Sequence, residues 1–288
     1  GQNIYNIALP MGELSEGEFR FAALGNSGTG KKPQRKLAEK MLEIQKETKF
    51  SMLIFLGDNL YNDGSPKAIE KKFLKPYGAL FENGAELRGA IGNHDARNDN
   101  GMLLQQMIFG MGAKTYYSFT KNDGGIEFFG LDTTLLVKKK KFYEGIEQIR
   151  WFEDRISKSK ARWKITFMHH PLYSSAKRHG FEADEDDDVG QVREKLEPIL
   201  TKYDVQVSLH GHDHVYERTI PQKGVQYFVS GAGGKLREGN LEPDSEVYAF
   251  GNDQVLSFML FSIKGDELTF WSIGSDGEIL DSGKIRNR

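Results

Sequence analysis

Residues 51–61 of the chain read SMLIFLGDNLY, an unbroken apolar run that ends at a glycine and an aspartate. A short apolar run that stops at such a turn signal is typical of a strand buried on both faces. Residues 87–91, 163–168 and 205–209 are also predicted to be strands, and each leads into polar residues. Ligands of layered α/β folds bind beyond the ends of such strands, so the polar residues after all four strands are expected to form one site.

The rest of the chain alternates predicted helices with strands and then finishes in strands. Helices are predicted at 33–49, 146–157 and 189–202 from their apolar spacing. Further strands are predicted at 19–24, 116–120, 126–131, 225–230, 255–263, 267–272 and 279–285, with the pair 116–120 and 126–131 forming a hairpin. We expect an α/β fold, a four-layer α/β/β/α sandwich of two stacked mixed sheets flanked by helices. Residues 1–18 are expected to be an irregular lead-in and residues 19–288 a single domain.

The composition limits the partners and the kind of metal ligand. The 288 residues carry a net charge of −2, which gives no sign of a nucleic-acid partner. No run of 18 apolar residues occurs, so no membrane span is expected. The chain has no cysteine, so any metal ion must be held by oxygen atoms and imidazole nitrogens.

Four polar segments follow the predicted strand ends: 57–61 (GDNLY), 92–95 (GNHD), 169–171 (HHP) and 210–214 (HGHDH). They hold six of the seven histidines of the chain: His94, His169, His170, His210, His212 and His214. Carboxylate, amide and imidazole ligands suit Zn, Fe and Mn. Two such ions about 3.5–4 Å apart can clamp the attacking and leaving oxygens of a phosphoryl transfer. Asp58 is the best candidate to bridge two ions, because each of its oxygens can bind one.

Together these motifs resemble the calcineurin-like metallophosphoesterases. Tyr61, three residues after Asp58, narrows the resemblance to the purple acid phosphatases. Three further stretches are similar to the small, tartrate-resistant type of that family: 130–133 (GLDT), 176–180 (AKRHG) and 229–233 (VSGAG). The resemblance extends from about residue 19 to residue 233.

The resemblance implies two metal ions. Asp58 would bridge them, and Tyr61 and His214 would hold the first, which is iron in the family. The second ion, Fe, Zn or Mn, would be held by three further residues: Asn93, His169 and His212. The resemblance also implies substrate contacts for three histidines: His94 at the phosphoryl group, His179 as the group that protonates the leaving alcohol, and His170 as a residue of the pocket or its surroundings. A histidine suits proton transfer because its ordinary pKa lies near neutral pH.

One motif departs from the family pattern. The first strand should end in Gly-Asp, and the aspartate should bind the first metal, but residues 25–28 read GNSG and place Asn26 there. An amide is neutral and a weaker oxygen donor than a carboxylate, and ligand charge matters most for a trivalent ion. We therefore expect the first site to bind iron less firmly, to prefer a divalent ion, or to be only partly occupied.

The predicted function is metal-dependent hydrolysis of phosphomonoesters by in-line attack of a metal-bound hydroxide at a dinuclear site, an acid phosphatase-like activity that Asn26 would reduce. One alternative is a catalytically impaired phosphatase-like scaffold or binding protein, which Asn26 and the acidic run 184–188 favour. A second is a phosphodiesterase. Residues 25–31 (GNSGTGK) also match most of a nucleotide-binding P-loop, but Lys32 replaces the Ser or Thr that must bind magnesium.

The remaining expectations concern substrate and setting. We expect a small phosphoester or phosphoprotein substrate and a monomeric protein. The family resemblance and the absence of a starting methionine predict a secreted or periplasmic location. The charge runs 138–141 and 184–188 are expected to be solvated loops.

Overall fold

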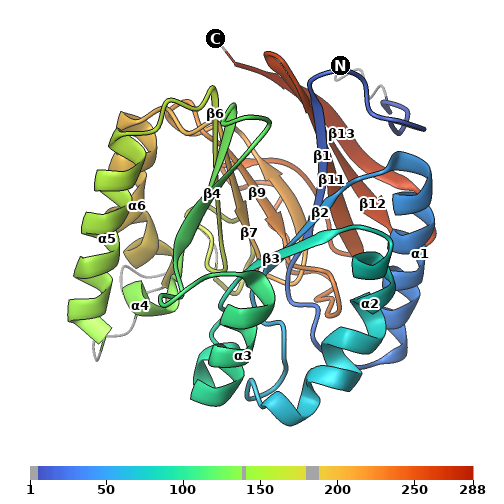
Figure 1. The fold of residues 1–288 in the computed structure, drawn as a ribbon, viewed down its shortest axis with the longest axis horizontal. Helices are drawn as coiled ribbons and strands as arrows, with labels where there is room; N and C mark the ends of the chain where they lie inside the picture. The colour runs from blue at the N-terminus through green and yellow to red at the C-terminus, as the bar shows by residue number, and fades with distance from the viewer. Residues whose placement is uncertain (1–5, 138–140, 180–187, 288) are drawn as a thin grey trace.

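The computed structural model describes residues 6–137, 141–179 and 188–287, and its strands form two sheets (Figure 1). The first sheet contains, in spatial order, β13 (Ile279–Arg286), β12 (Glu267–Gly274), β11 (Ser257–Lys264), β1 (Glu18–Leu24), β2 (Met52–Leu56) and β3 (Glu86–Ala90). The second contains β10 (Tyr248–Asn252), β8 (Tyr216–Thr219), β9 (Gln226–Ser230), β7 (Val207–His210), β6 (Trp163–Met168), β5 (Ile126–Gly130) and β4 (Tyr117–Lys121).

Both sheets are mixed. In the first, β1, β2 and β3 run parallel, whereas β11 pairs antiparallel with β1, β12 with β11 and β13 with β12. In the second, β5, β6, β7 and β9 run parallel, and β4 and β8 pair antiparallel with their neighbours. The carboxyl ends of the parallel strands in both sheets therefore carry the loops that sequence analysis assigned to the site.

Helices cover the outer faces of the two sheets. On the side of the first sheet lie α1 (Lys32–Thr48) and α2 (Lys75–Glu82), and on the side of the second lie α5 (Phe142–Ser157) and α6 (Asp188–Lys202) (Figure 1). The shorter α4 (Thr134–Val137) adjoins α5 and α6, and α3 (Asp99–Phe109) packs against β3. This layering confirms the predicted four-layer sandwich.

Aromatic side chains hold the two sheets together. Phe21 of β1 stacks on Phe261 of β11 with ring centroids 4.7 Å apart, and it meets Phe128 of β5 edge-on at 5.2 Å. Phe228 of β9 meets Phe270 of β12 at 4.8 Å. All of these rings are buried. Because such pairs add to the free energy gained by burying apolar surface, the sheet interface is expected to be a rigid base for the loops above it.

Most predicted strands and helices are confirmed within about two residues, including the hairpin of β4 and β5. Five of the α-helices and strands in the described residues have no counterpart in the prediction: α2, α3, α4, β8 and β10. The strand β8 reads YERT, and its Glu217 and Thr219 are fully buried. A polar sequence of four residues gives no apolar alternation, so only the tertiary contacts of β8 identify it as a strand.

Candidate metal centre

The site lies where strand ends of the two sheets face each other. Gly57 follows β2 and Gly92 follows β3, whereas His169 follows β6 and Gly211 follows β7. The backbone N–H of Gly211 donates to the His169 carbonyl at 3.0 Å, and the N–H of Asn26 donates to the Gly57 carbonyl at 2.9 Å. These two bonds join neighbouring loops within each sheet, and the N–H of Gly25, which donates to the Ser230 carbonyl at 2.7 Å, joins the first sheet to the second.

Two glycines allow the loops to approach this closely. Gly57 has a φ of +85°, and a Cβ there would lie 2.4 Å from Nδ1 of His169. A Cβ at Gly92 would lie 2.2 Å from the backbone nitrogen of Asp58. Any larger residue at either position would displace a proposed ligand, because real Cβ atoms essentially never come this close to other atoms.

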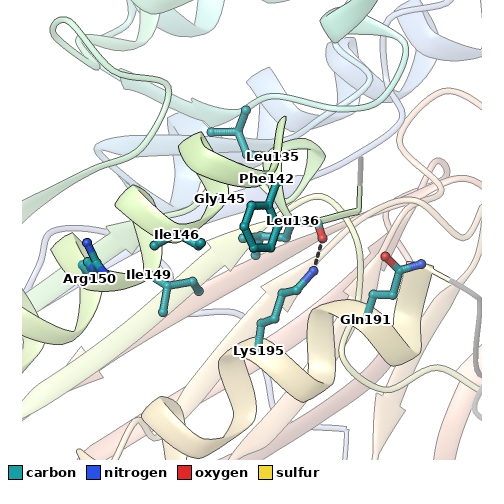
Figure 2. Close-up of a pocket in the computed structure, with 9 residues that line it drawn as sticks. All are labelled: Leu135, Leu136, Phe142, Gly145, Ile146, Ile149, Arg150, Gln191 and Lys195. Atoms are coloured by element: carbon teal, nitrogen blue, oxygen red, sulfur yellow. Dashed lines mark hydrogen bonds between the residues drawn. The ribbon is translucent and has the colours of Figure 1, made fainter. Parts of the chain in front are cut away.

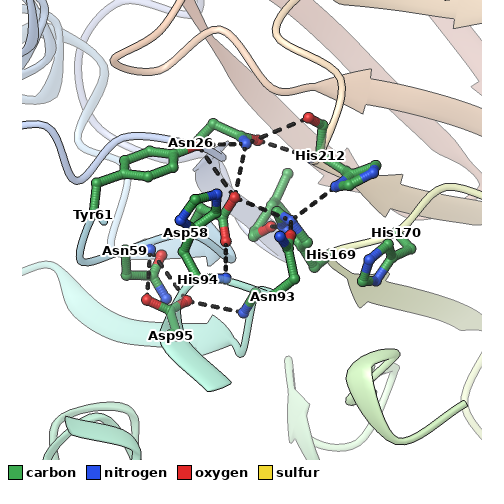
Figure 3. A network of polar contacts seen from close by, with 12 residues as sticks. Asn26, Asp58, Asn59, Tyr61, Asn93, His94, Asp95, His169, His170 and His212 are labelled. Carbon is green, nitrogen blue, oxygen red and sulfur yellow. Dashed lines mark hydrogen bonds and ion pairs between the residues drawn. The ribbon is translucent and has the colours of Figure 1, made fainter. Parts of the chain in front are cut away.

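Four of the predicted ligands converge on one point (Figure 3). Nε2 of His169 lies 3.0 Å from Oδ1 of Asn93, 3.4 Å from Oδ2 of Asp58 and 3.3 Å from Nδ1 of His212. Nδ1 of His169 lies 2.8 Å from the Leu56 carbonyl, so this nitrogen carries the proton and Nε2 keeps its lone pair. Two imidazole nitrogens, an amide oxygen and a carboxylate therefore face one another.

The groups predicted for the first ion also lie together. The Tyr61 hydroxyl is 3.2 Å from Oδ2 of Asp58 and 3.4 Å from Nε2 of His214. Asn26 is fully buried beside them (Figure 3). Its Oδ1 accepts the backbone N–H of His212 at 2.8 Å, and its Nδ2 donates to the Tyr61 hydroxyl at 2.8 Å and to Oδ2 of Asp58 at 3.3 Å. The amide therefore presents its nitrogen, not its oxygen, to the other groups.

The protonation states of Asp58 and His212 suit a cation, whereas the charge of Asp58 outweighs burial and raises the pKa of His169, so an ion must displace a proton there. Burial alone would raise the pKa of the Asp58 carboxyl, but the His169 imidazole and the backbone N–H of His94 hold that pKa well below its usual range. Burial, together with the nearby His169, lowers the pKa of His212 to about 3. Metal ligands must be deprotonated, so an ionised Asp58 and a neutral His212 are the forms that an ion requires.

The first set is different. Burial, together with the Lys235 ammonium, lowers the pKa of His214 to about 4. Burial and the charge of Asp58 raise the pKa of the Tyr61 phenol well above its usual range, so that Tyr61 stays protonated and donates to Asp58. The residues fit an ion at the second position by number, atom type and charge. At the first position the Asn26 amide presents hydrogen-bond donors where a carboxylate oxygen is expected, so the residues do not fit a ferric ion there.

Comparison with known proteins identifies the family of the chain. The sequence profile of the calcineurin-like phosphoesterases matches residues 20–216, more than half of the chain. The chain belongs to the calcineurin-like phosphoesterase family. Within it, the chain is similar to purple acid phosphatase 17 of Arabidopsis thaliana, with 26% identity over 254 residues that cover 80% of the chain and 72% of the relative. It is 23% identical to mouse (Mus musculus) tartrate-resistant acid phosphatase type 5, over all of the chain and 96% of the relative. The predicted resemblance to purple acid phosphatases is therefore confirmed.

Solved structures of this phosphoesterase fold superpose well. GAP50, described as the anchor in the inner membrane complex of Plasmodium, gives a TM-score of 0.81 at 17% identity, over 94% of this chain and 89% of GAP50. The purple acid phosphatase PPD1 from yellow lupin (Lupinus luteus) seeds gives 0.78 at 21% identity, over 93% of this chain and 54% of that chain. At these identities the two structures establish the fold and not the activity.

A polar cavity of about 210 Å³ opens beside the predicted metal ligands. Asp58, Asn93, His212 and His214 form part of its wall, and His94 and His179 also line it. Three arginines complete the lining: Arg97, Arg178 and Arg237. The arginines give the cavity a positive charge that suits a phosphoryl group. Arg97 and Arg237 had no signal in the sequence, because Arg97 ends a three-residue 3-10 helix, Arg237 lies in a loop, and both are outside every motif.

A hydrogen-bonded chain supports His179. Its Nδ1 lies 3.0 Å from Oδ1 of Asp213, and Oδ2 of Asp213 accepts the Ser174 hydroxyl at 2.6 Å. Asp213 is buried; burial would raise its pKa, but its contact with His179 keeps that pKa below the usual value. Asp213, the residue between His212 and His214, was assigned no role from the sequence, although its position inside that motif pointed to the site.

Asp95 lies under the candidate metal centre and holds two of its loops together by hydrogen bonds; it was assigned no role from the sequence. Its carboxylate accepts the backbone N–H groups of Asn59, Leu60 and Gly92 at 2.9–3.2 Å. Burial and the charge of Asp58 raise the pKa of Asp95 to about 6. Asp95 thus ties the segment after β2 to the segment after β3.

His170 lies behind the cavity wall. It is fully buried, its Nδ1 lies 2.6 Å from the Thr133 hydroxyl, and its Nε2 lies 3.6 Å from Oδ2 of Asp188. Its ring centroid is 4.5 Å from that of His212. Among the described residues His170 is not part of the cavity lining, so the geometry places it as a support for His212 and not at the substrate.

The acidic run and the lysine run are described only in part. Residues 184–187 of the acidic run and residues 138–140 of the lysine run lie outside the described residues. Asp188 begins α6 and faces His170, whereas Lys141 is exposed and lies 3.6 Å from Glu144. None of the helices in the described part of the chain has the length and apolarity needed to cross a bilayer.

A second pocket, of about 410 Å³, lies between α4, α5 and α6 and is separate from the metal centre (Figure 2). Its walls are mainly apolar: Leu135, Leu136, Phe142, Ile146 and Ile149. Its Lys195 ammonium donates to the Leu136 carbonyl. This pocket offers neither metal ligands nor a cluster of cations, so it does not compete with the polar cavity as a phosphoester site.

Proposed function

We propose that the chain is a metal-dependent phosphatase that hydrolyses phosphomonoesters at the polar cavity. The observation that carries this proposal is the convergence of Asp58, Asn93, His169 and His212 beside a cavity lined by histidines and arginines. The names of the relatives, purple acid phosphatase and tartrate-resistant acid phosphatase, support the same activity.

Four residues are proposed to hold a divalent Zn, Mn or Fe ion. The Leu56 carbonyl fixes the tautomer and direction of His169, and the backbone N–H of His94 fixes Oδ1 of Asp58 at 2.9 Å. A bound ion at this position supplies a Lewis acid and makes water a stronger nucleophile near neutral pH. The preformed hydrogen bonds reduce the reorganisation that ion binding requires.

The cavity wall is proposed to bind the phosphoryl group. Nδ1 of His94 lies 2.6 Å from the Asn62 carbonyl, so this nitrogen carries a proton and Nε2 remains for the substrate. Arg97 also donates to Asn62, at 3.1 Å, which places its guanidinium beside the His94 ring. Guanidinium groups bind the oxygens of phosphate through paired hydrogen bonds, and they favour a monoester, which carries two negative charges, over a diester with one.

His179 is proposed to protonate the leaving alcohol. The Asp213 carboxylate accepts a hydrogen bond from Nδ1–H of His179. This bond orients the ring and leaves Nε2 to carry the proton that is transferred. A buried carboxylate in this position also stabilises the imidazolium form that must exist before transfer. The role depends on position, and the described cavity lining includes His179 on the same wall as His212.

The test is hydrolysis by the chelator-treated chain reloaded with Zn, Mn or Fe. Three probes separate the substrate classes: p-nitrophenyl phosphate, a phosphoserine peptide and bis(p-nitrophenyl) phosphate. We expect hydrolysis of at least one monoester, and we expect His169→Ala to abolish it while the thermal unfolding midpoint shows that the variant remains folded. Faster hydrolysis of the diester than of both monoesters would identify a phosphodiesterase instead.

A second candidate function is phosphate binding without turnover, as in a phosphatase-like scaffold. The observation in its favour is the buried Asn26 amide, which faces Asp58 and Tyr61 with its nitrogen. The same experiment decides between the two. Binding of inorganic phosphate by calorimetry, with no hydrolysis of any probe under any metal, would support the scaffold and refute the phosphatase. A monomeric state and a secreted or periplasmic location remain predictions.

A further inference from the structure

The orientation of the Asn26 amide is fixed by the backbone around it. If the amide were turned over, its NH2 group would face the N–H of His212, which now donates to Oδ1 at 2.8 Å. Two donors would then oppose each other in a fully buried position, and each would lose its hydrogen bond without gaining one from water. The nitrogen therefore stays directed toward the Tyr61 hydroxyl and Asp58.

This orientation removes more than one ligand from the first metal position. An amide nitrogen offers hydrogens and no lone pair for a metal. By donating to the Tyr61 hydroxyl and to Oδ2 of Asp58, Asn26 also occupies lone pairs on two oxygens that an ion there would need. An aspartate at position 26 could accept the same His212 N–H with one oxygen and offer the other to an ion.

Positive side chains surround the same position. Nζ of Lys235 lies 3.7 Å from the centroid of the Tyr61 ring, and the ammonium of Lys72 donates to the Tyr61 carbonyl. Lys235 also interacts electrostatically with Asp58 and His214. Lys235 lies in the 233–237 segment just after the 229–233 motif, and Arg237 in the same segment lines the cavity. Cations so close to a ligand set with one carboxylate oppose the entry of a multivalent ion.

We propose that this centre holds a single divalent ion, at Asp58, Asn93, His169 and His212, and that the Asn26 amide and the Lys235 ammonium replace the first ion of the family. The amide takes over the hydrogen-bonding role of the missing ion toward Tyr61 and Asp58. Lys235 takes over its charge, and Arg237 of the same segment lines the cavity in which an anionic substrate would bind. This inference rests on the metal site proposed above, but it concerns the number of ions and is independent of turnover.

The experiment counts ions in four forms of the full-length chain: the unchanged protein, Asn26→Asp, Lys235→Met and the double variant. Each is treated with chelator, reloaded with excess Zn²⁺, desalted and measured by elemental analysis, and the affinities are measured by calorimetry. We expect one ion in the unchanged chain and two in the double variant. Loss of surrounding groups alone weakens metal binding 10–100-fold, so a second ion should bind the unchanged chain at least about 100-fold more weakly than the double variant.

A spectroscopic measurement identifies the first position directly. Loaded with Fe³⁺, the double variant should gain a visible tyrosinate-to-iron absorption band that disappears when Tyr61→Phe is added, and the unchanged chain should lack this band. Lys264→Met, at an exposed lysine of β11, removes the same charge elsewhere and should leave the count at one. His169→Ala in the unchanged chain should reduce the count to zero.

Each outcome decides the inference. Two ions in the unchanged chain, a tyrosinate band in it, or one ion that survives His169→Ala would overturn the single-ion centre. An equal count in the unchanged chain and in the double variant would show that Asn26 and Lys235 do not control the first position. A count of one without hydrolysis of any phosphoester would leave the single-ion inference standing and would refute only the proposed activity.

Discussion

Replacing Glu217 by glutamine should change how the stability of the protein depends on pH. Glu217 lies in β8 and is fully buried, and its carboxylate accepts the backbone N–H of Ser175 at 2.8 and 3.0 Å. Burial raises its pKa from the ordinary 4.5 to about 7, and this one hydrogen-bond donor only partly opposes the effect. The folded protein therefore holds a neutral carboxylic acid over a pH range in which the unfolded chain holds a carboxylate.

The sign and size follow from proton linkage. Below pH 4.5 the group is protonated in both states, and its full contribution to stability is present. Between pH 4.5 and 7 the unfolded chain loses the proton first, so the free energy of unfolding falls as pH rises; above pH 7 the fall is complete. A pKa difference of this size corresponds to about 3 kcal/mol.

The assay is urea unfolding followed by tryptophan fluorescence at pH 4, 5.5, 7 and 8, on chelator-treated protein so that metal release does not contribute. Relative to the unchanged chain, Glu217→Gln should be more stable at pH 8 than at pH 4 by about 3 kcal/mol. Glu194→Gln, at an exposed position of α6, serves as the matched control. A difference between Glu217→Gln and the unchanged chain that is constant over this pH range would refute the reasoning.

Two further predictions concern the site. Gly57→Ala would place a Cβ 2.4 Å from Nδ1 of His169 at a positive φ, so it should lower the unfolding free energy by about 2–3 kcal/mol and weaken Zn²⁺ binding in calorimetry. Gly78→Ala in α2, where a Cβ meets no described atom within 4 Å, should instead stabilise the helix by about 1 kcal/mol; equal effects at both positions would contradict the steric argument. Asp213→Asn should slow hydrolysis of an alkyl phosphate about 10–100-fold more than that of p-nitrophenyl phosphate, because only the alkoxide leaving group needs the proton that His179 carries. Equal slowing of both substrates would remove His179 from that role.

The strands and the cluster of ligands were predictable because both follow from local sequence. An apolar run that ends in Gly-Asp predicts a buried strand and a polar residue just beyond its end. Strand ends of this kind predict that Asp58 and His169 lie at the same site. The charge of a ligand could also be read directly, so the departure at Asn26 was visible.

What the sequence could not predict depends on contacts between distant segments. The direction of the Asn26 amide is set by the N–H of His212, which lies 186 residues away. Arg97 and Lys235 lie near the site in short segments outside the strands and long helices. In such segments apolar periodicity does not predict the direction of a side chain. Strand β8 is polar in sequence because its buried Glu217 and Thr219 are compensated by partners elsewhere in the fold.

The hydrogen bond from His169 Nδ1 to the Leu56 carbonyl has a consequence for the order of events in folding. Leu56 ends a strand of the first sheet and His169 follows a strand of the second, with 113 residues between them. Because the proposed ligands come from both sheets, an ion has no complete binding site until the sheets have docked. Metal binding should therefore leave the folding rate nearly unchanged and slow unfolding, because the ion binds only after the two sheets have docked.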